Sequence, residues 1–306
     1  MRRRVAVPSF VAALAAAGLL ATGCAASSDG GGGGGGANST PPAAAGGSAS
    51  GTAPAADACA PGTLKTHTSG VLTVATDTPA YEPWFVDDKP SNGKGYESAV
   101  AYAVAKQLGY PADKVKWVNA SFNAVVSPAP KNFDFDINQV SITAKRAKVV
   151  DFSSGYYDVA QAVVTMKSNK YAHVTSVAAL KGAKLGAQKG STSFTAITDV
   201  IKPSRTPAEY PTNDLAVQAL KNGTIDGLVV DLPTGLYITA AQVDGSTIAG
   251  QLPVTGHPEQ FGLVLDLHSP LTSCVTKAVD ALRADGTLTA LQKQWLTTSA
   301  GAPELK

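Results

Sequence analysis

Residues 133–157 read FDFDINQVSITAKRAKVVDFSSGYY, and they open with an alternation of apolar and polar side chains. Phe133, Phe135 and Ile137 fall on one face of the strand that this alternation predicts. Further strand candidates lie on both sides of this stretch, and they alternate with segments of helical periodicity. These candidates are Val71–Thr76, Val115–Val118, Ala162–Met166, Lys184–Ala187 and Ile225–Asp231.

Helices are predicted from apolar periodicity and from end signals. The segment Tyr96–Leu108 ends before Gly109, a residue type that favours the position after a helix. The segment Asp214–Lys221 has Asn213 as its expected cap, and the last helix is expected to start at Ser269 with proline in its first turn. Strands that alternate with helices predict an α/β fold with largely parallel sheets.

Residues 1–23 resemble an export signal. Arg2–Arg4 supply a basic start, and the apolar run Val5–Leu20 is too short for a membrane-spanning helix. The small residues before Cys24 resemble the lipobox of bacterial lipoproteins, which predicts lipidation of Cys24, palmitate included, and extracytoplasmic anchoring to the cell membrane. An ordinary cleaved signal followed by an incidental cysteine is the alternative.

Residues 24–58 consist mostly of glycine, alanine, serine, threonine and proline. Such a segment buries too little apolar surface to offset the entropy of ordering it, so we expect a flexible tether. Its random-coil reach is roughly 30 Å for about 34 residues.

The chain has three cysteines, Cys24, Cys59 and Cys274. In an oxidising compartment an odd thiol needs an explanation. If Cys24 carries lipid, Cys59 and Cys274 remain as a pair, and a disulfide would tie the start of the folded region to the C-terminal helix. Two buried free thiols are the alternative.

Charge and motifs exclude several classes of function. Removal of Arg2–Arg4 leaves 22 basic and 23 acidic residues, and this near-neutral balance has no footprint for nucleic acid. Asp134 and Asp136 imitate the start of a calcium loop, but Gln139 stands where such a loop needs glycine. The four histidines lack metal-ligand spacing, and no nucleophile elbow or phosphate loop is present. We therefore expect no metal, no cofactor and no enzymatic activity.

Seven motifs, in order along the chain, resemble the family 3 extracellular solute-binding proteins, the polar amino-acid receptors of ABC importers. They cover nearly all of residues 71–296. They are LTVATD (72–77), GKGYESAVAYAVAKQLG (93–109), SFNAVV (121–126), the stretch 133–157 quoted above, LGAQKGSTS (185–193), GTIDGLVVDLPTG (223–235) and FGLVLDLHSPLTSCVTKAVDALRADGTLTALQKQWL (261–296).

The resemblance implies a periplasmic-binding-protein-like fold of type II. Two α/β lobes would be joined by a hinge of two crossing strands, with a ligand cleft between the lobes. Lobe 1 is expected to hold residues 59–159 and 261–306, and lobe 2 residues 160–260.

The function implied is that of the extracytoplasmic solute-binding component of an ABC importer. The chain, as a monomer, would bind a free polar amino acid by hinge closure and deliver it to the membrane permease. An amino-acid-sensing lipoprotein without transport and a cyclohexadienyl-dehydratase-like enzyme on the same fold are the alternatives.

Four residues match the positions that hold the two charged ends of an amino acid. Arg146 matches the arginine that clamps the α-carboxylate, since a guanidinium meets a carboxylate with two parallel hydrogen bonds. Ser141 matches a position that also faces the ligand carboxyl group. Thr192 matches a threonine in a loop of the second lobe, whose amides could bind the carboxylate. Asp231 matches the partner of the α-ammonium group. A surface position for Arg146 and a helix-capping role for Asp231 are the alternatives.

Three further residues, Asp77, Tyr81 and Phe122, match positions that hold the ligand side chain. Asp77 favours a polar or basic ligand. The chain also departs from the family: Asn138 and Gln139 stand where small residues are usual, which changes the pocket volume, and Glu97 replaces the usual aspartate.

Overall fold

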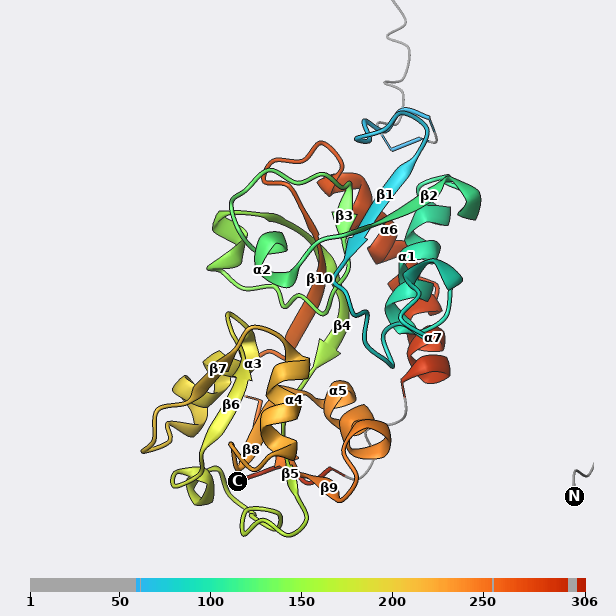
Figure 1. The fold of residues 1–306 in the computed structure, drawn as a ribbon. Helices are drawn as coiled ribbons and strands as arrows, with labels where there is room; N and C mark the ends of the chain where they lie inside the picture. Colours follow the sequence, from blue (N-terminus) through green and yellow to red (C-terminus); the bar gives the residue numbers. More distant parts are fainter. Residues whose placement is uncertain (1–58, 61, 255, 297–301) are drawn as a thin grey trace, which may run out of the picture. The chain divides into compact units, whose positions relative to one another are not determined.

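The computed structural model of the protein describes residues 59–60, 62–254, 256–296 and 302–306. The expected signal, Cys24 and the tether therefore lie outside the described residues. The strands form two sheets of five strands each (Figure 1). The first sheet has the order β2 (Val115–Asn119), β1 (Leu72–Thr76), β3 (Phe135–Asp136), β10 (Glu259–Leu265), β4 (Asp151–Val159), and the second has the order β7 (Ala208–Tyr210), β6 (Leu185–Gln188), β8 (Gly227–Asp231), β5 (Gln161–Met166), β9 (Ser246–Gln251).

Each sheet has one strand that runs against its neighbours. In the first sheet β1 is parallel to β2 and β3, whereas β10 is antiparallel to both β3 and β4. In the second sheet β6 is parallel to β7 and β8, whereas β5 is antiparallel to both β8 and β9. The sheets are therefore mixed, and the expectation of largely parallel sheets holds for all strands except β5 and β10.

Helices cover the sheets and complete the two-lobed α/β fold. Helices α1, α6 and α7 pack against one another and bury an apolar cluster on one face of the first sheet (Figure 1). No helix in the described part of the chain is long and apolar enough to cross a membrane. The helices are α1 (Tyr96–Gln107), α2 (Phe122–Val125), α3 (Thr192–Ala196), α4 (Asn213–Lys221), α5 (Leu232–Tyr237), α6 (Thr272–Ala284) and α7 (Thr287–Trp295).

Two helix starts differ from the sequence prediction. Helix α4 begins at Asn213, because Thr212 is extended and its Oγ1 accepts the N–H of Leu215 at 3.3 Å. Helix α6 begins at Thr272, because a turn precedes it in which Ser269 Oγ accepts the N–H of Leu271 at 3.2 Å. Helix α4 is therefore capped by Thr212 instead of Asn213, and α6 starts without a side-chain cap.

The alternation at 133–138 does not separate a buried face from an exposed one. Phe135 and Ile137 belong to the cluster beneath α1 and α6, yet Asp134, Asp136 and Asn138 are buried as well. The strand β3 lies between β1 and β10, and a second apolar cluster around Phe133 covers its other face. A central strand with two covered faces has no solvent side for its polar residues.

The last residues of the chain lie against the second sheet. The N–H of Gln251 donates to Pro303 O at 2.8 Å, and the N–H of Leu305 donates to Gln251 O at 2.9 Å. The buried Leu305 side chain lies over Gly250, where an added Cβ would be 2.5 Å from Leu305 Cδ2. We expected all of residues 261–306 in lobe 1, and residues 302–306 differ from that expectation. The remaining lobe boundaries stay a prediction.

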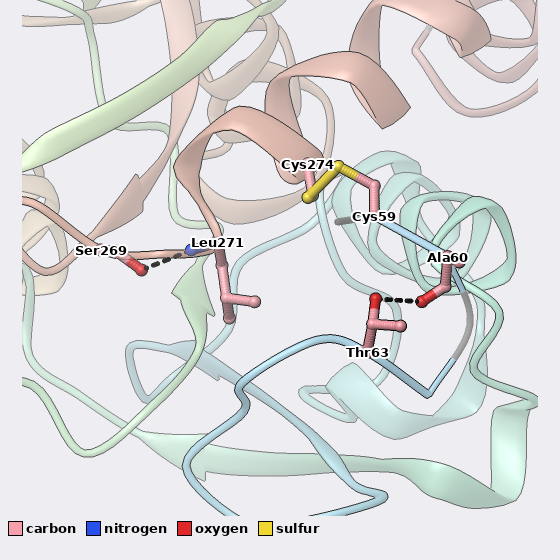
Figure 2. Close-up of a disulfide and its surroundings, with 6 residues drawn as sticks. All are labelled: Cys59, Ala60, Thr63, Ser269, Leu271 and Cys274. Carbon is pink, nitrogen blue, oxygen red and sulfur yellow. Dashed lines mark hydrogen bonds between the residues drawn. A yellow bond between two sulfur atoms is a disulfide. The ribbon is translucent and has the colours of Figure 1, made fainter. Parts of the chain in front are cut away.

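The predicted disulfide is present between Cys59 and Cys274, with Cα atoms 5.3 Å apart. Figure 2 shows it joining α6 to the first described residues of the chain, where Thr63 Oγ1 donates to Ala60 O at 2.8 Å. Cys59 and Cys274 pack against the α1–α6–α7 cluster. The alternative of two free thiols is therefore wrong.

Replacing both Cys59 and Cys274 with serine should lower the free energy of unfolding by about 2–5 kcal/mol, because the bond closes a long loop in the unfolded chain. Urea unfolding followed by circular dichroism measures this change. The wild-type chain in reducing buffer should match the double variant. An unchanged unfolding midpoint in both samples would show that the bond contributes nothing to stability.

Candidate functional site

The candidate site is a pocket whose walls come from both sheets. Six of the seven residues expected to contact a ligand line it, and Ser141 lies directly behind the wall. Most of the lining follows the carboxyl ends of strands, where ligands bind in open α/β sheets. The lining residues are Asp77, Thr78, Tyr81, Phe122, Asn138, Gln139, Arg146, Gln188, Ser191, Thr192, Ser193, Thr212, Asn213, Val230 and Asp231.

Arg146 is buried, so the alternative of a surface arginine is wrong. Its backbone N–H donates to Thr143 Oγ1 at 3.1 Å, which fixes the turn that carries it. Its guanidinium lies over the ring of Phe122, 5.2 Å from the ring centroid. Burial lowers the pKa of Arg146, and the charges of Glu259 and Asp231 oppose that shift. The pocket therefore has one fixed cation in its wall.

Two hydrogen bonds fix the Arg146 guanidinium across the pocket. It donates from Nη1 to Ser141 O at 2.8 Å, in the part of the chain that follows β3. It donates from Nη2 to Gly190 O at 3.1 Å, in the loop that follows β6 of the second sheet. The Arg146 guanidinium thus links the segment after β3 of the first sheet to the loop after β6 of the second sheet.

Asp231 ends β8 and directly precedes α5, yet it makes no capping hydrogen bond. Asp231 thus occupies the N-cap position of α5, but its side chain does not cap the helix. Its Oδ1 instead accepts from Gln161 Nε2 at 2.8 Å. Burial, followed by the nearby Glu259 carboxylate, raises the pKa of Asp231 to about 8. A carboxyl group with a pKa this high is held in an environment that lacks a cation close enough to stabilise its charge.

Ser141 and Thr192 approach each other beside the pocket. Their hydroxyl oxygens are 3.2 Å apart, and Ser141 Oγ also donates to Glu259 Oε1. Ser141 is 1% exposed, whereas Thr192 lines the pocket.

The pocket is also lined by the three residues expected to contact a ligand side chain, Asp77, Tyr81 and Phe122. Asp77 Oδ1 accepts from the N–H of Thr78 at 2.7 Å, and Asp77 Oδ2 accepts from the N–H of Phe122 at 3.1 Å. The Asp77 carboxylate thus accepts the N–H of the first residue of α2 and also lines the pocket. Tyr81 is half-buried, and burial together with the charge of Asp214 raises its pKa.

The two bulky amides that depart from the family pattern both line the pocket. Gln139 adopts a left-handed backbone with φ 48°, which is uncommon for a residue with a side chain. The buried carboxylate of Glu97 fixes this conformation by accepting the N–H of Gln139 at 2.7 Å and also its side-chain amide. Asn138 is 8% exposed, and its Nδ2 has no hydrogen-bond partner within the described structure.

Two important polar residues were not predicted, Gln161 and Glu259. They lie behind the pocket, where Gln161 Nε2 donates to Glu259 Oε2 at 3.1 Å as well as to Asp231. Each is the first residue of an antiparallel strand, β5 or β10. The amino end of such a strand lies at the edge where its neighbours have their carboxyl ends. Gln188 lies at the carboxyl end of β6, where the sequence leads one to expect site residues. Gln161 and Glu259 lie at amino ends, where it does not.

Within the described parts of the chain, no group of three or more histidine, cysteine or acidic residues is placed to hold a metal ion.

The Glu97 carboxyl group should make stability depend on pH. Burial raises its pKa from 4.5 to about 7, so between these values the folded chain retains a proton that the unfolded chain has lost. The free energy of unfolding should therefore fall as pH rises from about 5 to 7. Urea titrations should show a shallower fall for Glu97→Gln. The exposed Glu209→Gln serves as the control and should keep the wild-type slope. Equal slopes for all three proteins would contradict the assignment.

A family model described as bacterial extracellular solute-binding proteins, family 3, matches residues 72–298. Among curated proteins, the glutamine-binding protein GlnH of Bacillus subtilis is 28% identical over 238 residues, 76% of this chain and 83% of its own length. The arginine-binding protein 1 of Escherichia coli is 28% identical over 211 residues, 66% of this chain and 81% of its own length.

Solved structures show the same similarity. An ancestral arginine-binding protein bound to glutamine is 30% identical, with a TM-score of 0.62 over 75% of this chain and 99% of its own. The ancestral amino-acid-binding protein AncCDT-1, a precursor of cyclohexadienyl dehydratase, is 27% identical, with a TM-score of 0.62 over 74% of this chain and 96% of its own.

Proposed function

Because this chain belongs to the bacterial extracellular solute-binding proteins of family 3, we propose that it binds a free amino acid outside the cytoplasm and delivers it to the permease of an ABC importer. One observation carries this proposal. Arg146, in the turn between β3 and β4 of the first sheet, and Asp231, at the end of β8 in the second sheet, line the same pocket. A free amino acid is a zwitterion, and a site that excludes water needs one group of each charge to bind it.

The charge of the pocket wall matches this ligand. Arg146 would receive the α-carboxylate through its planar fork. Asp231 would bind the α-ammonium group. The positive charge of that group would offset the burial and the Glu259 charge that raise the pKa of the Asp231 carboxyl group. Curated relatives named for glutamine, arginine, cystine and histidine binding support the same ligand class.

The ligand side chain would point toward Asp77. No lysine or second arginine lines the pocket in the described structure, so an acidic side chain near Asp77 would find no further cation to balance its charge. A side chain with N–H groups, basic or amide, can donate to this carboxylate. We therefore propose a polar or basic amino acid rather than an acidic one.

Contacts between the sheets support binding by hinge closure. Trp84 Nε1 of the first lobe donates to Thr234 Oγ1 of the second at 2.9 Å, and both side chains are buried. Together with the bonds of Arg146 and Ser141 to the second lobe, this contact would hold the lobes around a ligand and present one surface to the permease.

The proposed setting is extracytoplasmic, with the chain acting as a monomer anchored through lipid on Cys24. A sensing role without transport uses the same binding site and differs only in the partner. A dehydratase activity is disfavoured, because the relative AncCDT-1 is itself described as an amino-acid-binding protein. Incubation with prephenate or arogenate should therefore yield no product.

The proposal is tested by thermal shift against the twenty amino acids, followed by calorimetry of those that stabilise the chain. A ligand at 100 times its dissociation constant should stabilise the protein by about 2.7 kcal/mol. Arg146→Ala should weaken binding by about 100-fold or more, since removing one partner of a buried charge pair costs roughly 2–5 kcal/mol.

The matched control is Arg205→Ala, which removes an exposed arginine of the second lobe and should bind like the wild type. If no amino acid stabilises the wild-type chain, or if Arg146→Ala binds with unchanged affinity, the proposed function is wrong.

A further inference from the structure

Trp84 is buried where the two lobes meet, although it does not line the pocket. Its indole packs edge-on against three rings in the core of the first lobe, with centroid distances of 6.1 Å to Tyr96, 5.5 Å to Tyr157 and 5.6 Å to Phe261. Edge-to-face pairs favour defined ring orientations. The indole N–H is thereby directed at the second lobe, where Thr234 Oγ1 accepts it at 2.9 Å.

The backbone of Trp84 is fixed as firmly as its ring. The Trp84 carbonyl accepts the N–H groups of Glu97 at 2.9 Å and Ser98 at 3.4 Å, both in the first turn of α1. Gly95 permits this close approach, because it has φ 94° and an added Cβ would collide with the Trp84 carbonyl oxygen. Trp84 is therefore part of the rigid core of the first lobe.

Thr234 is held equally firmly in the second lobe. It lies in the first turn of α5 and is 7% exposed. The helix rests directly on the second sheet at Gly235, where an added Cβ would be 3.0 Å from Ile248 Cδ1 and 3.1 Å from Val164 Cγ2. Asp231, which lines the pocket, directly precedes this helix. Any movement of Thr234 away from the first lobe therefore also moves Asp231.

The indole and the hydroxyl thus belong to different rigid bodies, and their hydrogen bond can form in only one arrangement of the lobes. Two further bonds between the lobes are made by Arg146 and Ser141, residues that are expected to contact a ligand. Those groups can exchange a protein partner for the ligand. The indole lies outside the pocket, so its bond is independent of what the pocket contains.

We propose that the hydrogen bond from Trp84 to Thr234 is a latch that stabilises the closed lobes, and that Trp84 is a positioning residue that keeps Asp231 at the pocket. This role rests on the proposed function, because it concerns the closure that would retain the ligand. Neither Trp84 nor Thr234 lines the pocket. The two residues would therefore set how fast a ligand leaves, while the pocket residues set which ligand binds.

The variant Thr234→Val tests the latch, because valine is similar in size to threonine and cannot accept a hydrogen bond. In closed lobes the indole N–H would then be buried without a partner, whereas in open lobes water could bind it. The variant should therefore favour open lobes. Thr239→Val is the matched control, because the Thr239 hydroxyl donates within the second lobe, to Leu236 O at 3.0 Å.

A first measurement needs no ligand. Spin labels on encoded residues at Lys145 and Glu209 leave the disulfide intact, and these exposed positions line one groove from opposite lobes. Pulsed electron resonance gives the distribution of distances between the labels. Thr234→Val should add longer distances, and Thr239→Val should match the wild type. A merely structural role would lower the urea midpoint of Thr234→Val without changing its distance distribution, and that result would overturn the latch.

A second measurement follows the binding of L-arginine by calorimetry and stopped flow. Thr234→Val should raise the Kd about tenfold, as expected when a buried donor loses its partner, and mainly through faster dissociation. Trp84→Phe removes the donor, so the double variant Trp84→Phe/Thr234→Val should bind no more weakly than Trp84→Phe alone.

Losses that simply add in the double variant would show that Trp84 and Thr234 do not act through their bond, and would overturn the proposal. If the wild type does not bind L-arginine, the thermal-shift screen against the other amino acids decides the proposed function. The distance distribution of Thr234→Val still decides the latch in that case.

Discussion

One antiparallel strand in each sheet determines where the polar groups of this protein meet. Because β5 and β10 run against their neighbours, their first residues lie at the edge where β6 and β8, or β1 and β3, end. Gln161 and Glu259 are those first residues, and Asp77 and Asp231 lie at the neighbouring strand ends. A parallel sheet would have carried the first two to the opposite edge.

Several features of the structure could be predicted from the sequence. The strand β8 and the helix α1 follow from local signals, a continuous apolar run and a helical period ended by Gly109. The disulfide joins distant residues and follows instead from cysteine parity. Arg146 and Asp231 were found through motifs, and both lie where the motifs imply, in the wall of one pocket. Their roles toward a ligand remain proposals. Local patterns were sufficient wherever one segment alone sets the structure.

The misses share one cause, which is contact between segments far apart in the sequence. The polar face of β3 is buried because an apolar cluster around Phe133 covers it, which no alternation within β3 reveals. The residues 302–306 pair with β9 although they follow α7 of the first lobe. Glu259 forms hydrogen bonds with Ser141 and Gln161, at separations of 118 and 98 residues. A window of sequence holds no information on such pairs.

Around the pocket, acidic side chains outnumber the basic side chains that could balance their charge. Glu97 and Asp136 are fully buried, and both oxygens of Asp136 lack a hydrogen-bond partner among the described residues. Burial, together with neighbouring Glu97 and Asp77, raises the pKa of Asp136 well above its usual value. A chain optimised for stability alone would replace these carboxyl groups with apolar side chains, since buried charges without close partners destabilise the fold. A cation bound beside Asp136 and Asp231 would lower this electrostatic cost, which agrees with the proposed binding of an ammonium group.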